Sequence, residues 1–263
     1  MSRFEELRNA IAARGRILIL FSGGLDSALL AKLAHDALGP DAVALTINSA
    51  VIPRSETDMA HSLAEEIGIE HHVLTVDELG QRHFAVNPPD RCYHCRKARD
   101  ATAWRWAQEH GIPSIADGLN FSDLSDYRPG LKAADEDGIW HPFIEHEVGK
   151  DEIRAISRDL GLSGWDRPSM ACLASRFPHG YAVSSPRVER VGHAEEYLRS
   201  LGFVKVRVRH FPYDLALVEV EDLTRAIQMR SDISSHLRDL GFDFVALDME
   251  DFASGKMNRT ASM

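Results

Sequence analysis

The sequence contains little cysteine, with three residues of this type in a chain of 263. A small and odd number of cysteines does not build the disulfide framework of a compact secreted protein. The informative question is therefore whether these thiols bind a metal or carry out sulfur chemistry.

Long apolar runs are also missing. No run approaches the roughly 20 residues that a membrane-spanning helix needs. The first residues, MSRFEELRNAIAARGR, are charged and have helical periodicity, without the apolar centre of a signal peptide. We therefore expect a cytoplasmic protein with no membrane partner.

Positive charge is scarce: 30 lysines and arginines stand against 40 acidic residues, a formal net charge of -10. Most nucleic-acid affinity comes from basic side chains on phosphates, and this composition argues against such a partner. The hydrophobic fraction of 44% and charged fraction of 27% are typical of a globular protein. A small-molecule substrate is the expected partner.

Predicted strands and helices alternate through the first two thirds of the chain. We predict strands at 16–21, 42–47, 71–76 and 114–118, and helices at 4–14, 27–38, 56–68, 98–110 and 148–160. This order predicts an α/β fold with a doubly wound parallel sheet and right-handed crossovers. Ligands of such sheets bind at the carboxyl ends of the strands.

The order of elements changes from about Ser184, with a helix at 188–201, strands at 204–209, 215–220 and 244–247, and a helix between the last two. We predict a nucleotide-binding domain at 1–183. A smaller α+β domain at 184–250 is expected to serve substrate binding or oligomerisation. Residues 251–263 lose all periodicity, which predicts a mobile tail.

The segment SGGLDS lies between a predicted buried strand and a helix, where backbone N–H groups and the positive helix end can hold a phosphate. Gly23 and Gly24 allow the backbone to approach the anion, and Ser22 and Ser27 can donate hydroxyl hydrogens. Asp26 is a candidate ligand for a magnesium ion on the phosphates. A glycine-rich turn with a capping side chain is the alternative.

Neither the Walker pattern GxxxxGK[ST] nor the dinucleotide pattern GxGxxG occurs at this turn. SGGLDS resembles the SGGxDS signature of the PP-loop ATP pyrophosphatases. The resemblance implies that a substrate attacks the α-phosphorus of ATP, giving an adenylate and pyrophosphate. That superfamily contains several functions, so the loop predicts only this first half-reaction.

Cys92 and Cys95 form a CxxC motif on a loop before a predicted helix, and Cys172 lies far along the chain. Neighbouring arginines and a helix start favour thiolates, which bind metals or act as nucleophiles. Three thiolates are too few for a closed zinc site unless another ligand joins them. They suit an iron–sulfur cluster with one open iron, whereas unrelated thiols are the alternative.

Four segments together resemble the LarE family, the pyridinium-3,5-biscarboxylic acid mononucleotide sulfurtransferases, over residues 16–220. These segments are SGGLDS, NPPDRCYHCRKA, DGLNFSDLSDYRPGLKAA and RPSMACLASRFPHG. The resemblance implies that ATP adenylylates the substrate carboxylates and that sulfur then replaces AMP. The products are the thiocarboxylates of the nickel-pincer cofactor of lactate racemase.

Two routes to sulfur are implied by this resemblance. In one, Cys92, Cys95 and Cys172 hold a 4Fe-4S cluster with hydrosulfide on the open iron; in the other, Cys172 gives up its own sulfur. All three positions are filled here, which favours the cluster. The expected catalytic residues are these cysteines and Asp26, and the expected cofactors are ATP, Mg²⁺ and the cluster. A sulfide source and a homo-oligomer are also expected.

Further site residues follow from the same resemblance. Gly118 and Asn120 follow a predicted strand, where the nucleoside of ATP binds in this fold. Arg128 and Arg176 are expected to contact phosphate or carboxylate groups of the substrate, because a guanidinium pairs with both. A polar surface loop is the alternative for the first of these arginines.

Arg207 and Arg209 alternate along a predicted strand, so their side chains share one face. The resemblance implies that they bind the phosphate of the mononucleotide, and a solvated strand face is the alternative. Glu195, Glu196 and Glu219 are expected in the same region, without an assigned role.

Three other functions compete with this interpretation. A tRNA thiolation enzyme would use the same adenylation, but the net charge and the lack of further Cys or His pairs oppose it. An amide-forming synthetase would not need the three cysteines. A nucleotide-binding module with a structural metal would bind ATP without releasing pyrophosphate.

Overall fold

The computed structural model describes residues 3–125, 129–167, 170–250, 252–253 and 256–257. The chain divides into two compact units: the first is Met1–Val76 with Cys92–Met170, and the second is Asp77–Arg91 with Ala171–Met263. The boundary expected between 183 and 184 stays a prediction, and residues 171–183 group with the second unit. Arg128 and most of the expected tail at 251–263 lie outside the described residues.

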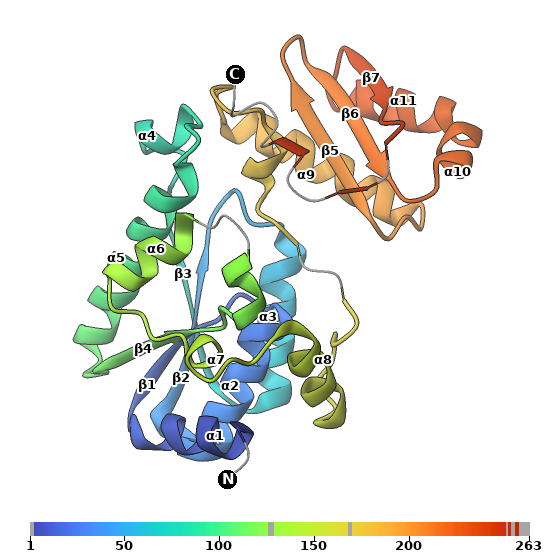
Figure 1. Cartoon of the computed structure of the whole chain (residues 1–263). Helices are drawn as coiled ribbons and strands as arrows, with labels where there is room; N and C mark the ends of the chain where they lie inside the picture. Colours follow the sequence, from blue (N-terminus) through green and yellow to red (C-terminus); the bar gives the residue numbers. More distant parts are fainter. Residues whose placement is uncertain (1–2, 126–128, 168–169, 251, 254–255, 258–263) are drawn as a thin grey trace. The chain divides into compact units, whose positions relative to one another are not determined.

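The first unit contains four parallel strands, β1 (Ile17–Leu20), β2 (Ala42–Asn48), β3 (Glu70–Thr75) and β4 (Ser114–Asp117), in the order β3-β2-β1-β4 (Figure 1). The chain moves outward from β1 in one direction to β2 and β3, and in the other direction to β4. The gap between the ends of β1 and β4 is therefore the topological switch point, where doubly wound sheets bind ligands. The predicted fold class is confirmed.

Helices cover both faces of this sheet because successive strand residues point to opposite sides. Ile17 and Ile19 pack against one set of helices, and Leu18 between them packs against the other. The helices on the first face are α1 (Arg3–Ala13), α2 (Leu25–Leu38), α3 (Arg54–Ile67), α7 (Pro142–Glu145) and α8 (Lys150–Asp159). Those on the second face are α5 (Arg91–Glu109) and α6 (Pro129–Glu136). The short turns η1 (Gly39–Asp41) and η2 (Phe121–Ser125) complete this unit.

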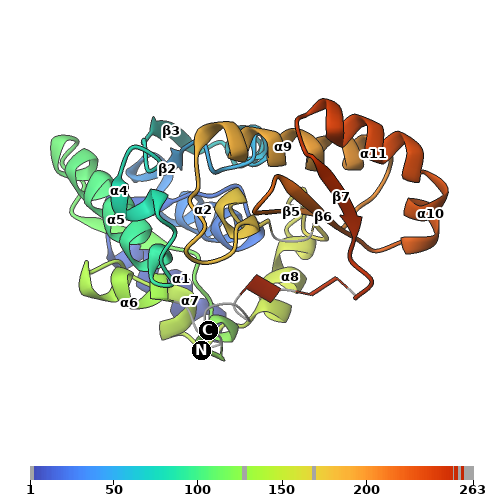
Figure 2. The same cartoon turned by 90° about the horizontal axis from the view of Figure 1, so that it is seen from above.

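The second unit has an antiparallel pair, β5 (Val206–Phe211) and β6 (Leu215–Val220), with β7 (Phe244–Leu247) parallel to β6. Figure 2 shows α9 (Ser185–Ser200) and α11 (Arg230–Asp239) on one side of these strands. The unit also contains α4 (Arg82–Ala85), η3 (Leu173–Arg176) and α10 (Leu223–Gln228). The expected smaller α+β part is confirmed.

The start of α5 differs from the prediction. The helix begins at Arg91 rather than at residue 98, so Cys92 and Cys95 lie in its first two turns rather than on a preceding loop. The Arg91 N–H already bonds to the Pro88 carbonyl, which begins the helical pattern. Within the described residues, no helix is long and apolar enough to cross a membrane.

Candidate functional site

The SGGLDS loop connects β1 to α2 at the switch point. The Ser27 hydroxyl donates to the Gly24 carbonyl at 2.9 Å and lies 3.1 Å from the Ser22 hydroxyl. The Ser22 hydroxyl in turn accepts the Gly24 N–H at 3.2 Å. Gly24 is the N-cap of α2 and has no side chain to cap the first turn. The loop is thus held in shape while the positive end of α2 remains available to an anion.

Two glycines are required by close backbone packing. Gly23 has a φ of +72°, and a Cβ there would lie 2.8 Å from the backbone of Glu56 and Ala60 in α3. A Cβ on Gly118, just after β4, would lie 2.6 Å from the Ser27 nitrogen. No side chain fits at either distance, so both positions bring backbone directly against the loop.

A cavity of about 310 Å³ opens beside this loop, within the first unit. Its size is in the range of small-ligand pockets. One part of its wall is apolar, formed by Leu45, Ile47 and Ile52. The lining also includes Asp26, Asp123 and other polar side chains. An apolar region beside a phosphate cradle is the arrangement that a nucleotide requires.

Asp26 lies in the first turn of α2 and is paired with Lys150, the first residue of α8. The Lys150 ammonium donates to both carboxylate oxygens of Asp26, at 2.5 and 2.7 Å. The buried Asn120 amide lies 3.4 Å from the same carboxylate. The sequence pattern predicts a helix at 148–160 but assigns it no functional residue, and it does not identify Lys150. A sequence signal for Lys150 exists: the lysine follows, within about 30 residues, the polar loop that begins at the carboxyl end of β4.

Arg96 of α5 crosses the cavity wall and joins two buried aspartates. Its guanidinium donates to both oxygens of Asp100 at 2.8 Å and to Asp117 at 2.6 Å. Burial opposes the charge on Arg96, but these carboxylates outweigh it and raise the Arg96 pKa. Asp117 also accepts from His141 at 2.6 Å; burial is outweighed, and the Asp117 pKa falls below its ordinary value. The network fixes the carboxyl end of β4.

His71 of β3 is held in its neutral form under the same cavity. The Thr46 hydroxyl donates to the Phe21 carbonyl at 2.6 Å, so it accepts from His71 Nε2 at 2.8 Å. Burial, followed by the charges of His61 and His72, lowers the His71 pKa to about 4. Protonation therefore opposes the folded state.

We expect the His71 site to make unfolding pH-dependent. Its folded pKa lies below the ordinary 6.5, so the stability is fully present above pH 6.5 and falls as the pH drops toward 4. One excluded proton sets an upper limit of about 1.4 kcal/mol per pH unit, and partial solvent access reduces it. His71→Gln retains an N–H donor and should flatten this part of the urea-unfolding profile. His83→Gln, at an exposed histidine of the second unit, is the control, and equal profiles for the two variants would contradict the assignment.

All three cysteines lie among the described residues, and none forms a disulfide. Cys92 is exposed and Cys95 is half-buried; their three-residue spacing places them on one face of α5. Cys172 is half-buried and is the N-cap of η3 in the second unit.

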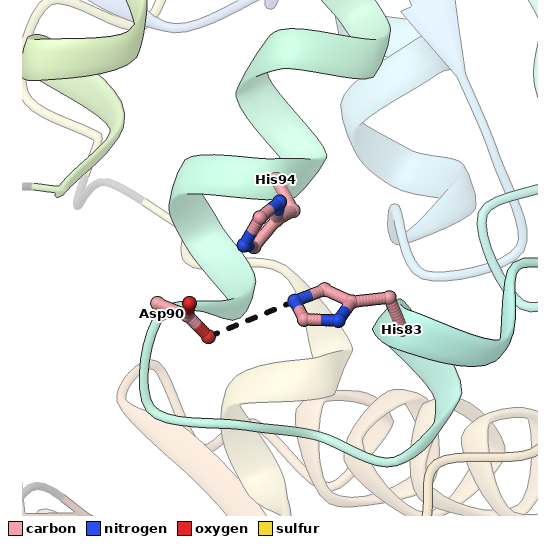
Figure 3. Close-up of side chains that lie close together, drawn as sticks. All are labelled: His83, Asp90 and His94. Carbon is pink, nitrogen blue, oxygen red and sulfur yellow. Dashed lines mark ion pairs between the residues drawn. The ribbon is translucent and has the colours of Figure 1, made fainter.

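Residues 77–91 hold the segment that carries Cys172, within the second unit. Asn87 is fully buried with a φ of +57°, and its amide donates to the carbonyls of Phe177, Pro178 and Tyr181. Arg91, the residue before Cys92, donates to the Ala174 carbonyl at 2.9 Å. In Figure 3, His83 and Asp90 of the same segment face each other, with Nε2 and Oδ1 3.8 Å apart.

Two arginines named from sequence lie in buried ion pairs of the second unit. Arg176 is 2% exposed and donates to both oxygens of Glu195, at 2.7 and 3.2 Å. Arg209 is 3% exposed and donates to both oxygens of Glu219. The two glutamates thus neutralise these buried guanidiniums. Glu196 is exposed.

Arg207 is the more accessible arginine of this group. It donates to the Ala253 carbonyl at 2.8 Å and stacks over the Phe252 ring at 4.4 Å. Burial and the positive charges of Arg176 and Arg209 lower its pKa. A bound anion would stabilise the charged form of the Arg207 guanidinium.

Comparisons with known proteins agree with this site. The asparagine synthase family model matches residues 5–86, which include the SGGLDS loop. An uncharacterised protein of Synechocystis is 40% identical over 98% of this chain and 97% of its own length. The tRNA-specific 2-thiouridylase of Methylorubrum populi is 26% identical over 64% of this chain and 53% of its own.

A further relative carries a specific activity in its name. The pyridinium-3,5-bisthiocarboxylic acid mononucleotide synthase of Lactiplantibacillus plantarum is 38% identical over 93% of this chain and 90% of its own. Together with the parallel sheet and its SGGLDS loop, this similarity shows the family. The chain belongs to the LarE family of ATP-dependent sulfurtransferases, within the PP-loop ATP pyrophosphatases.

Proposed function

We propose that this enzyme adenylylates the carboxylates of pyridinium-3,5-biscarboxylic acid mononucleotide and converts them to thiocarboxylates. The observation that carries the proposal is the anion cradle of Gly23, Gly24 and Ser27 at the switch point, in a chain with three cysteines. The relative of L. plantarum named for the bisthiocarboxylic acid product supports the choice of acceptor. The product would serve synthesis of the nickel-pincer cofactor of lactate racemase.

The first half-reaction is an attack on ATP. A carboxylate oxygen of the substrate bonds to the α-phosphorus, and the bond to the bridging oxygen breaks to release pyrophosphate. Ser22, Gly23, Gly24 and Ser27 would hold that leaving group through hydroxyl and N–H donors. Gly118 and Asn120 would border the nucleoside. This displacement needs no general acid, because pyrophosphate leaves as an anion.

A magnesium ion fits the carboxylate at the end of the loop, because carboxylate oxygens are ligands that Mg²⁺ prefers. The Asn120 Nδ2 donates to the Asp26 carboxylate at 3.4 Å, and the Asn120 Oδ1 accepts from the Ser122 N–H at 3.0 Å. When bound, the ion would offset charge on the phosphates. Asp26 would be its protein ligand.

The second half-reaction replaces AMP with sulfur. Sulfide attacks the acyl carbon, the bond from that carbon to the AMP oxygen breaks, and a proton is released from hydrosulfide. The donor set of Cys92, Cys95 and Cys172 fits three irons of a 4Fe-4S cluster, which would present hydrosulfide on its open iron. The bond from Arg91 to the Ala174 carbonyl supports this grouping, since it ties the chain next to Cys92 to the segment of Cys172.

Arginine side chains of the second unit would bind the phosphate of the substrate. Arg207 is the candidate for direct contact, because it is more accessible than Arg176 and Arg209, and burial and their positive charges lower its pKa. Arg176 and Arg209 stay candidates from the family resemblance, and in the structure their charges are balanced by Glu195 and Glu219. Arg128 remains a candidate from the family resemblance alone. We propose a homo-oligomer and an external sulfide source.

The experiment that tests the function uses the whole enzyme, prepared without oxygen and reconstituted with iron and sulfide. It is incubated with Mg²⁺, ATP, sulfide and the pyridinium mononucleotide, and products are identified by mass spectrometry. We expect pyrophosphate, AMP and an acceptor in which oxygen is exchanged for sulfur. A parallel incubation replaces the mononucleotide with tRNA, and thiolated tRNA formed there, with no thiolated mononucleotide in the first mixture, would support the tRNA-thiolation alternative. Pyrophosphate release without sulfur exchange would contradict the proposed second half-reaction.

A further inference from the structure

The SGGLDS loop carries no cation of its own. Phosphate loops of the Walker type include a lysine that reaches the β- and γ-phosphates. In this chain the corresponding sequence, residues 22–27, has none. Two arginines are among the described residues that line the cavity: Arg96 is paired with Asp100 and Asp117, and Arg99 donates to the Ser49 hydroxyl at 3.3 Å. The cation that contacts Asp26, at the end of the loop, comes from another helix.

Lys150 is the side chain that the structure brings to this place from α8. Its ammonium contacts both oxygens of Asp26, the predicted magnesium ligand, at 2.5 and 2.7 Å. About a third of its side chain is exposed, at 32%. The amine is thus beside the phosphate cradle and is accessible to a bound anion.

The backbone around Lys150 is fixed on three sides, so its reach is set by the fold. Its N–H donates to the Ser122 hydroxyl at 3.1 Å, and the Phe121 N–H donates to the Val148 carbonyl at 3.0 Å. The Gly149 N–H, at the N-cap of α8, donates to the Glu152 carboxylate at 3.2 Å. A rigid backbone with a flexible four-carbon side chain lets the amine change partners without moving the helix.

We propose that Lys150 is a phosphate-binding residue that occupies the magnesium position until the metal arrives. With no metal bound, its ammonium neutralises Asp26. When Mg²⁺ takes the Asp26 carboxylate, Lys150 releases it and donates to oxygens of the β- and γ-phosphates, because two cations on one carboxylate repel each other. Lys150 then stabilises the charge that develops on the leaving pyrophosphate. The inference rests on the proposed ATP site and adds a residue and an exchange of partners to it.

The test uses Lys150→Met, with Lys150→Gln as a second variant and Lys32→Met as the matched control. Lys32 pairs with Asp36 on the outer face of α2 at 2.6 Å, with 27% of its side chain exposed. Binding of Mn²⁺ alone is measured by electron paramagnetic resonance, and inorganic pyrophosphate binding by calorimetry at saturating Mg²⁺. Neither measurement needs the pyridinium substrate.

The two binding measurements should move in opposite directions. Lys150→Met frees Asp26, so Mn²⁺ should bind several-fold more tightly, by roughly the worth of a partly exposed ion pair. Pyrophosphate should bind roughly tenfold more weakly, because a charge-assisted hydrogen bond is lost. Pyrophosphate release from ATP should fall roughly 100-fold in kcat. Lys32→Met should match the wild type in all three measurements.

A purely structural lysine would weaken both binding events or neither. Wild-type pyrophosphate affinity and turnover in both Lys150 variants would overturn the proposal, as would weaker Mn²⁺ binding. If the wild-type enzyme accepts a different substrate, the Mn²⁺ and pyrophosphate measurements still decide the role of Lys150. If the wild-type protein binds no pyrophosphate, the proposed ATP site itself is wrong.

Discussion

Cys172→Ala is expected to abolish thiocarboxylate formation while pyrophosphate release from ATP continues. The two half-reactions use different groups, because the phosphate loop lies in the first unit and Cys172 is the N-cap of η3. Loss of a group that holds or donates the sulfur should reduce sulfur transfer by roughly three orders of magnitude or more. Pyrophosphate release should change only a few-fold. The measurement is single-turnover quantification of pyrophosphate and thiocarboxylate on the same sample.

Iron content separates the two possible roles of Cys172. If three cysteines hold a cluster, Cys92→Ala, Cys95→Ala and Cys172→Ala should each lose iron after anaerobic reconstitution, and the wild type should hold about four irons per chain. If Cys172 is sacrificed, the first two variants should remain active for one turnover. The wild-type mass should then fall by one hydrogen sulfide. That second result would refute the cluster assignment.

Gly118→Ala should cause the largest loss at the nucleotide site. The added methyl group would lie 2.6 Å from the Ser27 nitrogen and 2.8 Å from the Asp26 carbonyl carbon, both backbone atoms that cannot turn aside. The start of α2 must shift, which should cost about 1–3 kcal/mol of unfolding free energy. Displacement of a phosphate cradle by about 1 Å should reduce turnover roughly 100-fold. Stopped-flow pyrophosphate release and chemical denaturation measure the two effects.

Gly111→Ala is the control for this glycine. Gly111 has a positive φ, +64°, which Gly118 does not, and a Cβ there would meet no atom within 4 Å. This variant should lose stability through backbone strain alone and retain pyrophosphate release. Equal activity in Gly118→Ala and Gly111→Ala would contradict the requirement for close packing at the loop.

Local sequence patterns predicted most elements of the fold. Alternation of Ile17, Leu18 and Ile19 follows the period of a strand buried on both faces, and the structure divides these residues between two cores. The predicted strand at 215–220 and the predicted strand at 244–247 match β6 and β7 residue for residue. Such signals are local, since they depend on which neighbours along the chain are apolar.

Helix starts were less predictable. α5 begins at Arg91, several residues before its expected start, because Pro88 supplies the first carbonyl acceptor and Asn87 binds the Arg91 guanidinium. The charged sequence RCYHCRK gives no apolar periodicity there. Tertiary contacts, rather than a helical apolar face, support this first turn.

The sequence by itself determined the parallel sheet, the position of the phosphate loop and the three thiols, because strand periodicity, glycine turns and residue chemistry are local properties. Only the tertiary structure decided which charged side chains form ion pairs. Lys150 lies 124 positions from Asp26, and Arg176 lies 19 positions from Glu195. Ion pairs over such separations depend on how helices and strands pack, and a pattern along the chain carries no information about that packing.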